Sequence, residues 1–321
     1  MLIASWDEIE ADLKLGVFLM TVAAQSLIGD RKPEALAFGT AALGEALDNG
    51  QAANAQAYEL DDLRDFNVSK TQFWKVARIC FEFVQDKSPL DKLDVGDLQG
   101  DTLNWMTYFQ SAIPHDEYGT GLGTHSNRFR EHANKGAEYP LPGLHLAASA
   151  KANLVQFLQG FPLHPDMDTG FAPYEIASLA GMNIASVRNF VGPRGGKPIR
   201  SMQKDSWGSV YGHPLDALQW LAGRRNFNPG PLSEDWLHDV ADRIETPEQV
   251  GALIGIYAWV NRITTETIAE RGGLSFDLVR DWTRGHLTST DDAVSLARAA
   301  HVDPEFYCDL VARCGGFGAR I

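Results

Sequence analysis

The sequence predicts a mainly α-helical protein that is organised in three consecutive parts. Apolar residues recur at helical spacing along most of the chain, whereas the alternating pattern typical of strands is scarce. Two stretches rich in proline or glycine, 161–165 and 228–231, interrupt that spacing. A chain of 321 residues has room for two or three domains with cores of their own. We therefore expect an acidic all-α domain over 1–160, a second domain over 161–225 and a third over 226–321.

In the first part, the spacing predicts amphipathic or buried helices over 8–29, 33–48, 70–86 and 144–160. Ser5 and Glu8 form the pattern of a capping box, which marks the start of the first helix. Its most apolar stretch, roughly 15–28, is shorter than a membrane span and contains polar residues such as Gln25. We therefore expect a buried helix here and no contact with a membrane.

The charge is distributed unevenly along the chain. The formal net charge is −14, which by itself argues against a nucleic-acid partner. Residues 171–225, however, contain seven basic and three acidic side chains, whereas the parts before and after are acidic. The chain starts without the features of a secretory signal, and its three cysteines (Cys80, Cys308 and Cys314) form no disulfide framework. These observations favour a cytoplasmic protein with one segment suited to a polyanion.

That basic segment contains the spacing of a helix-turn-helix, between 173 and 190. Ala177 is placed where two helices cross closely, and Gly181, four residues later, falls at the tight turn, where a positive φ favours glycine. Val187 would anchor the second helix. Further inward positions are expected at Ile176, Ala180, Met182 and Phe190.

The outward residues of that second helix have the chemistry of base recognition. Arginine and asparagine bind guanine and adenine edges through paired hydrogen bonds, and small alanine or serine side chains allow a close approach. The predicted outward residues are Asn183, Ala185, Ser186, Arg188 and Asn189. The sequence therefore predicts a recognition helix for double-stranded DNA.

The residues that follow extend the pattern. The stretch 192–205 is rich in glycine and basic residues, and Pro214, Asp216, Ala217, Leu218, Trp220 and Leu221 open and fill a short helix. Over about 171–225 the chain resembles the excisionase and MerR-type winged helix-turn-helix family, although its loop before the last helix is longer. The resemblance implies a small β-wing, base contacts from Arg188 and Asn189, and phosphate contacts from Arg194, Lys197, Arg200 and Lys204.

A second motif repeats the same offsets at Ala269, Gly273 and Val279, with Ile268, Leu274 and Trp282 inward. The run 246–249 combines an N-cap threonine, a proline and a capping glutamine, so a helix is expected to begin there. Over about 247–310 the chain resembles the phage-repressor (Cro-type, XRE-like) helix-turn-helix family. The resemblance implies DNA contacts from Ser275, Arg280 and Arg284.

The second motif departs from its family in two respects. Gly272 occupies a position that is usually apolar, and the predicted recognition helix carries Asp277 and Asp281, which phosphate would repel. An aspartate can accept a hydrogen bond from cytosine, but this contact is rarer. The alternative is that this unit binds a protein partner or dimerises.

Enzymatic chemistry is not indicated. The sequence lacks the GxSxG, HExxH and P-loop patterns. A loop over 113–142 contains acidic residues and histidines that could gather a metal, but solvated surface is the favoured interpretation; they are His115, Asp116, Glu117, His125, Glu131 and His132. The same holds for phosphate binding by Arg128, Arg130 and Lys135. We expect no catalytic residue, no cofactor and no metal.

The sequence thus predicts a sequence-specific double-stranded DNA-binding protein, a transcriptional regulator of prokaryotic, phage or mobile-element type. A homodimer is expected, because one short recognition helix supplies few base contacts and symmetry doubles them. The N-terminal domain is the candidate for dimerisation, or for contact with RNA polymerase or another regulatory protein. The alternative is a protein-interaction module whose helix-turn-helix units no longer contact DNA, for which the net charge of −14 is the main argument.

Overall fold

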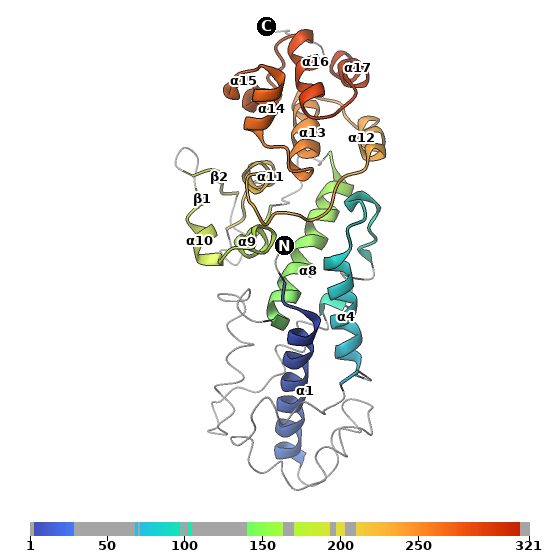
Figure 1. The fold of residues 1–321 in the computed structure, drawn as a ribbon, viewed down its shortest axis with the longest axis vertical. Helices are drawn as coiled ribbons and strands as arrows, with labels where there is room; N and C mark the ends of the chain where they lie inside the picture. Colours follow the sequence, from blue (N-terminus) through green and yellow to red (C-terminus); the bar gives the residue numbers. More distant parts are fainter. Residues whose placement is uncertain are drawn as a thin grey trace.

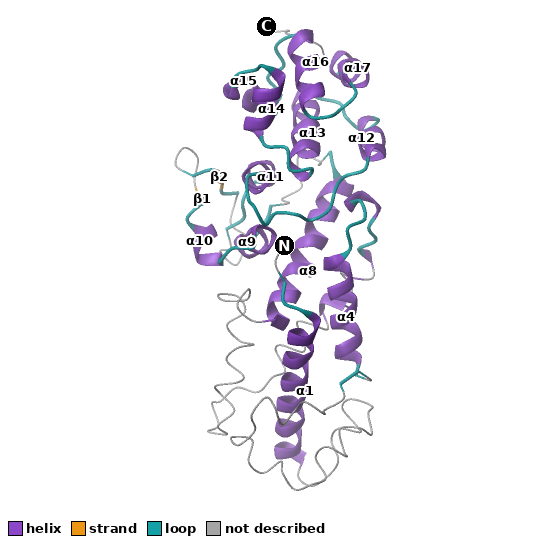
Figure 2. Ribbon diagram, viewed as in Figure 1, coloured by secondary structure: helices purple, strands orange, loops and turns teal. Residues whose placement is uncertain are grey.

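The computed structural model describes residues 3–28, 68–69, 71–96, 98, 102–104, 140–162, 170–192, 197–202 and 210–314. Helices predominate among them, which confirms the mainly α class (Figures 1 and 2). The elements are α1 (Trp6–Ile28), α4 (Gln72–Gln85), η3 (Leu90–Lys92), α8 (Pro140–Gly160), α9 (Pro173–Ala180), α10 (Ile184–Arg188), β1 (Val191–Gly192), β2 (Ile199–Arg200), α11 (Pro214–Ala222), α12 (Glu234–Ala241), α13 (Pro247–Val260), α14 (Thr265–Gly272), α15 (Phe276–Trp282), α16 (Thr290–Ala299) and α17 (Pro304–Arg313).

The long helix α8 organises the first part of the chain, since α1, α4, η3 and α9 all pack against it (Figure 1). It begins at Pro140, four residues before the predicted start, because proline fits the first turn of a helix, where its missing N–H costs nothing. The predicted capping box of α1 is confirmed: the Ser5 N–H donates to the Glu8 carboxylate at 2.8 Å. The helix expected over 33–48 lies outside the described residues.

A buried lysine joins α8 to the end of α4. The ammonium of Lys151 donates to the carbonyl oxygens of Phe83 (2.9 Å) and Asp86 (2.7 Å), which the last turn of α4 leaves without helical partners. Burial lowers the pKa of Lys151 to about 8. The contact fixes α4 along α8.

The middle part places α9, α10 and α11 around two very short strands. β1 and β2 pair in parallel, with Val191 opposite Ile199 and Gly192 opposite Arg200. A β-hairpin would pair its strands antiparallel, so this pair is not a hairpin wing. The bridges from Gly212 to Phe171 and to Ser201 are antiparallel, and they connect the segment before α11 to the segment before α9 and to the residue that follows β2.

The last part is wholly helical in the described residues, from α12 to α17. The predicted start of α13 is confirmed: Thr246 accepts from the Gln249 N–H, Gln249 accepts from the Thr246 N–H, and Pro247 occupies the first turn. α13 is buried along most of its length and packs on α11 on one side and α17 on the other. It therefore joins the middle part to the last part.

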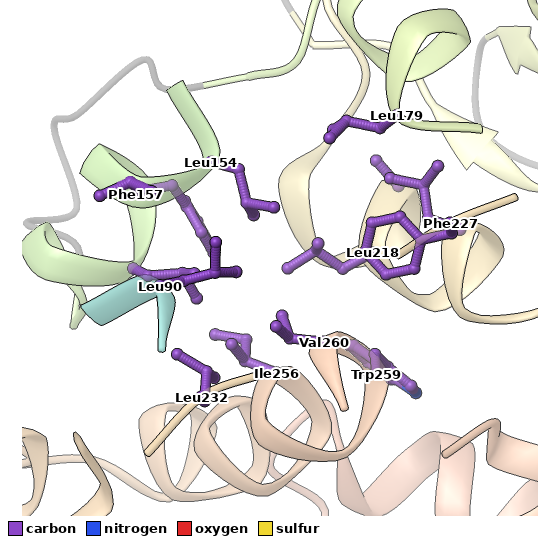
Figure 3. Close-up of a cluster of buried hydrophobic side chains, with 14 of the residues drawn as sticks. Leu90, Leu154, Phe157, Leu179, Leu218, Phe227, Leu232, Ile256, Trp259 and Val260 are labelled. Atoms are coloured by element: carbon purple, nitrogen blue, oxygen red, sulfur yellow. The ribbon is translucent and has the colours of Figure 1, made fainter. Parts of the chain in front are cut away.

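The buried apolar side chains of the described residues form one continuous cluster. Figure 3 shows Leu154 and Phe157 of α8, Leu218 of α11 and Ile256 and Val260 of α13 gathered in a single cluster, all of them buried. The borders that we expected at 160/161 and 225/226 stay predictions. In the described part of the chain, no helix is both long and apolar enough to cross a membrane.

Candidate nucleic-acid interface

The first helix pair, α9 and α10, is joined by a tight turn at Gly181. This glycine has a φ of 61°, in the left-handed region, and its N–H bonds back to the last turn of α9. Ala177 (1% exposed) and Val187 (0%) are buried where the two helices meet. The turn and the two inward positions are therefore those that the spacing predicts.

α10 presents a mostly polar face to solvent. The side chain of Asn183 begins the helix by accepting from the Ala185 N–H at 2.8 Å. Ile184 and Val187 are buried and fix the rotation of the helix. The exposed residues that result are Asn183, Ala185, Ser186, Arg188 and Asn189, as predicted. Among the described residues, Arg188 has no ion-pair partner that would compete for its guanidinium.

An aromatic contact holds the end of α10 against α11. The rings of Phe190 and Trp220 are 5.1 Å apart, and the guanidinium of Arg224 lies 4.1 Å from the Trp220 ring centroid. A cation over an indole ring is attracted by the ring's negative face. This stack keeps one positive charge near the end of α10, and among the described residues Arg224 forms no ion pair.

The basic residues expected in the wing have different environments. Lys197 is exposed just before β2, with its aliphatic stem against Gly192. Arg200 forms a bidentate ion pair with Asp216 in the first turn of α11: Nη2 lies 3.0 Å from Oδ1, and Nε pairs with Oδ2. The Arg200 N–H also donates to Asp216 at 3.1 Å. Arg194 and Lys204 lie outside the described residues.

A buried glutamate docks the first helix pair on α8. Glu175, 2% exposed, accepts from the Ala172 N–H at 2.7 Å at the start of α9, and from the side-chain amide of Asn153 on α8. Burial outweighs these hydrogen bonds and raises the pKa of Glu175 to about 7. The sequence offered no signal for this contact, because the partners are 22 residues apart on different helices.

The second helix pair, α14 and α15, has the same construction. Gly273 has a φ of 64° at the turn, and Ala269, Val279 and Trp282 are buried. The indole of Trp282 donates to the Tyr307 hydroxyl on α17 at 2.8 Å, which fixes α15 relative to α17. The inward residues predicted from the repeated offsets are thus placed inward.

The exposed face of α15 is less basic than that of α10. Arg280 pairs with Asp277 at 2.7 Å and with Asp281 at 3.0 Å, and the contact with Asp281 contributes most to raising the pKa of Arg280. Ser275 is exposed but its hydroxyl caps the helix by accepting from the Leu278 N–H. Arg284 is exposed after the end of α15.

The residues that the sequence suggested for a metal or a phosphate within 113–142 lie outside the described residues. In the part of the chain that the structure describes, no cluster of three or more His, Cys, Asp or Glu side chains is arranged to hold a metal ion. Asp216 is a second residue whose role was missed from the sequence. Its position in the first turn of a helix beside a basic segment was a usable signal.

No known protein family, curated protein or solved structure matches this chain.

Proposed function

We propose that this protein binds double-stranded DNA in a sequence-dependent manner, with α9 and α10 acting as the helix-turn-helix and α10 as its recognition helix. The observation that carries the proposal is the exposed face of α10, where Arg188 and Asn189 project beside the small Ala185 and Ser186. The two side chains with hydrogen-bonding heads can reach base edges, and the two small ones let the helix enter the major groove. The buried Val187 holds that face outward.

The local charge supports this assignment. Residues 171–225 are the basic segment of an otherwise acidic chain. Lys197 and Arg225 are exposed in it, whereas Arg200 is neutralised by Asp216. We therefore assign the phosphate contacts of the described residues to Lys197 rather than to Arg200. Regulation of transcription in a prokaryotic, phage or mobile-element setting is the function that fits such a protein, and a homodimer stays a prediction.

Two substitutions test the assignment in the full-length protein. Arg188→Ala should weaken binding to the preferred site by about 1–3 kcal/mol and relax the preference at one base pair. Lys197→Ala should weaken binding to all sequences alike and reduce the slope of log K against log salt by about one. Arg298→Ala, which removes an exposed charge on α16, is the matched control and should change neither quantity.

The experiment selects preferred sites from a random DNA pool and measures binding to a panel of sites at several salt concentrations. If Arg188→Ala and Lys197→Ala behave identically across the panel, the assignment of α10 as reader is wrong. The full-length chain is required, because α9 and α11 contribute to a core shared with α8 and α13.

A second candidate function is a protein-interaction module without DNA contact. The acidic charge of the last part favours it, together with Phe276, whose side chain is 42% exposed at the start of α15. Large exposed aromatic side chains are enriched at protein interfaces. Failure of the protein to bind any duplex at low salt would support this candidate over the first.

A further inference from the structure

The two helix pairs are joined by packed side chains rather than by a free linker. At the contact of α11 with α13 and α14, the Gln219 amide donates to the Thr265 hydroxyl at 3.0 Å, and the Trp259 indole donates to the same oxygen at 3.2 Å. Thr265 is 1% exposed. Leu218 and Val260 extend this contact into the shared core (Figure 3). Moving one pair relative to the other would break buried hydrogen bonds and open this core.

A second set of contacts, made through α8, also connects the two helix pairs. On one side, Asn153 of α8 holds Glu175 of the first helix pair. On the other side, the Ser233 N–H and hydroxyl donate to the Asp91 carboxylate at 2.9 and 2.6 Å, and the Trp236 indole donates to the Leu158 carbonyl at 3.0 Å. The chain between the two units is therefore pinned to η3 and α8. The two helix pairs belong to one body.

The helices α10 and α15 lie on the same side of that body (Figure 1). In the view of Figure 1, which looks down the shortest axis, α10 and α15 both occupy the left edge and follow one another along the long axis. A duplex that runs along this flank passes both helices in succession.

We propose that a single chain reads two unlike segments of one DNA duplex at a fixed separation, with α10 supplying most of the affinity and α15 supplying discrimination. This inference rests on the proposed function of α10. Once α10 is bound to DNA, the contact of α15 with the same duplex is intramolecular and costs little further translational freedom. A weak contact of α15 therefore suffices to contribute to sequence preference.

The side chains of α15 are suited to discriminating between DNA sequences rather than to adding affinity for DNA of any sequence. Asp277 stands in its first turn with a side chain that is 75% exposed, and the first residues of a recognition helix are those that meet base edges. A carboxylate accepts a hydrogen bond from the amino group of cytosine and is repelled by phosphate and by acceptor atoms of other bases. Repulsion from unmatched sequence raises specificity without raising affinity.

Spacing variants of the selected site test the fixed separation. The preferred site of the full-length protein should contain two unlike blocks, of which one depends on Arg188. Inserting 5 base pairs between the blocks moves the second to the opposite face of the duplex, and inserting 10 returns it to the same face about 34 Å further away. Both insertions should lower affinity at least about tenfold, to the level of the first block alone, because a rigid body follows neither change.

Recovery of affinity with the insertion of 10 base pairs would show that the connection between the helix pairs is flexible, and would overturn the inference. A preferred site made of one block, or of two identical blocks, would also overturn it. Loss of sequence preference in the wild-type protein would instead refute the proposed function itself, so the two failures are distinguishable.

Substitution of Asp277 tests the role of α15. Asp277→Asn should strengthen binding to unrelated DNA and reduce the preference at one base pair of the second block by about tenfold. Asp309→Asn makes the same change in charge on an exposed position of α17, which lies toward the opposite flank in Figure 1, and should do neither. Equal effects of the two substitutions would mean that only net charge matters, and that α15 has no contact with DNA.

Discussion

Glu175 makes the stability of this protein depend on pH in a direction opposite to that of most carboxylates. Burial raises its pKa from 4.5 to about 7 in the folded protein, while in the unfolded chain it ionises near the lower value. Between these values the folded state binds more protons than the unfolded state, so the free energy of unfolding falls as pH rises. Each unit of difference between the folded and unfolded pKa corresponds to 1.36 kcal/mol. The contribution of Glu175 to the free energy of unfolding that is lost between about pH 4.5 and 7 is therefore about 3 kcal/mol.

Glu175→Gln isolates this contribution. A glutamine keeps the shape and can still accept from the Ala172 N–H, but it does not ionise. We expect the free energy of unfolding of the variant, relative to that of the wild type, to rise by about 3 kcal/mol between pH 4.5 and pH 8. Urea unfolding followed by the fluorescence of the eight tryptophans measures both proteins at each pH.

The difference between the two proteins cancels the many other carboxylates of this acidic chain. Glu266→Gln, on an exposed position of α14, is the matched control and should give a curve parallel to the wild type. If the curve of unfolding free energy against pH for Glu175→Gln is also parallel to that of the wild type, Glu175 is ionised in the folded protein. It is then not buried between α8 and α9.

Two further substitutions probe the packing that positions the helices. Gly251→Ala should destabilise the protein by about 3 kcal/mol in urea unfolding, because a Cβ would collide with the backbone of Trp282 and come within 2.8 Å of the Gly285 nitrogen. Gly160→Ala meets nothing within 4 Å and should change stability by less than about 1 kcal/mol; an equal loss in both would contradict this packing. Asp216→Asn should lower stability by about 2 kcal/mol, and a double-mutant cycle with Arg200→Gln should show coupling of about 1 kcal/mol or more, whereas additive effects would exclude the ion pair.

Local features of this fold were predictable from the sequence. The turn at Gly181, the outward face of α10 and the start of α13 at Thr246 all depend on residues within about a dozen positions of one another, so their spacing is visible in the chain.

Long-range contacts were not predictable. Asp91 and Ser233 are 142 residues apart, and nothing in either neighbourhood indicates the other. The neutralisation of Arg200 was missed because the four basic residues over 194–204 were all assigned to phosphate. The position of Asp216 indicated a carboxylate near this segment, but which of the four it pairs with depends on the fold. The parallel pairing of β1 with β2 also depends on the path of the chain around it rather than on the composition of the strands.

The shared core of Figure 3 has a consequence for the folding of the chain during its synthesis on the ribosome. Leu158 completes the buried face of α8, but Val260, about a hundred residues later, completes the face of α13 that helps to cover the core. At about 5–20 residues per second, synthesis of the intervening segment takes roughly 5–20 s. During that interval the nascent chain exposes leucine and phenylalanine side chains that the finished protein buries. Chaperone capture of ribosome-bound chains should therefore peak while residues 160–260 are being made and decline once α13 emerges.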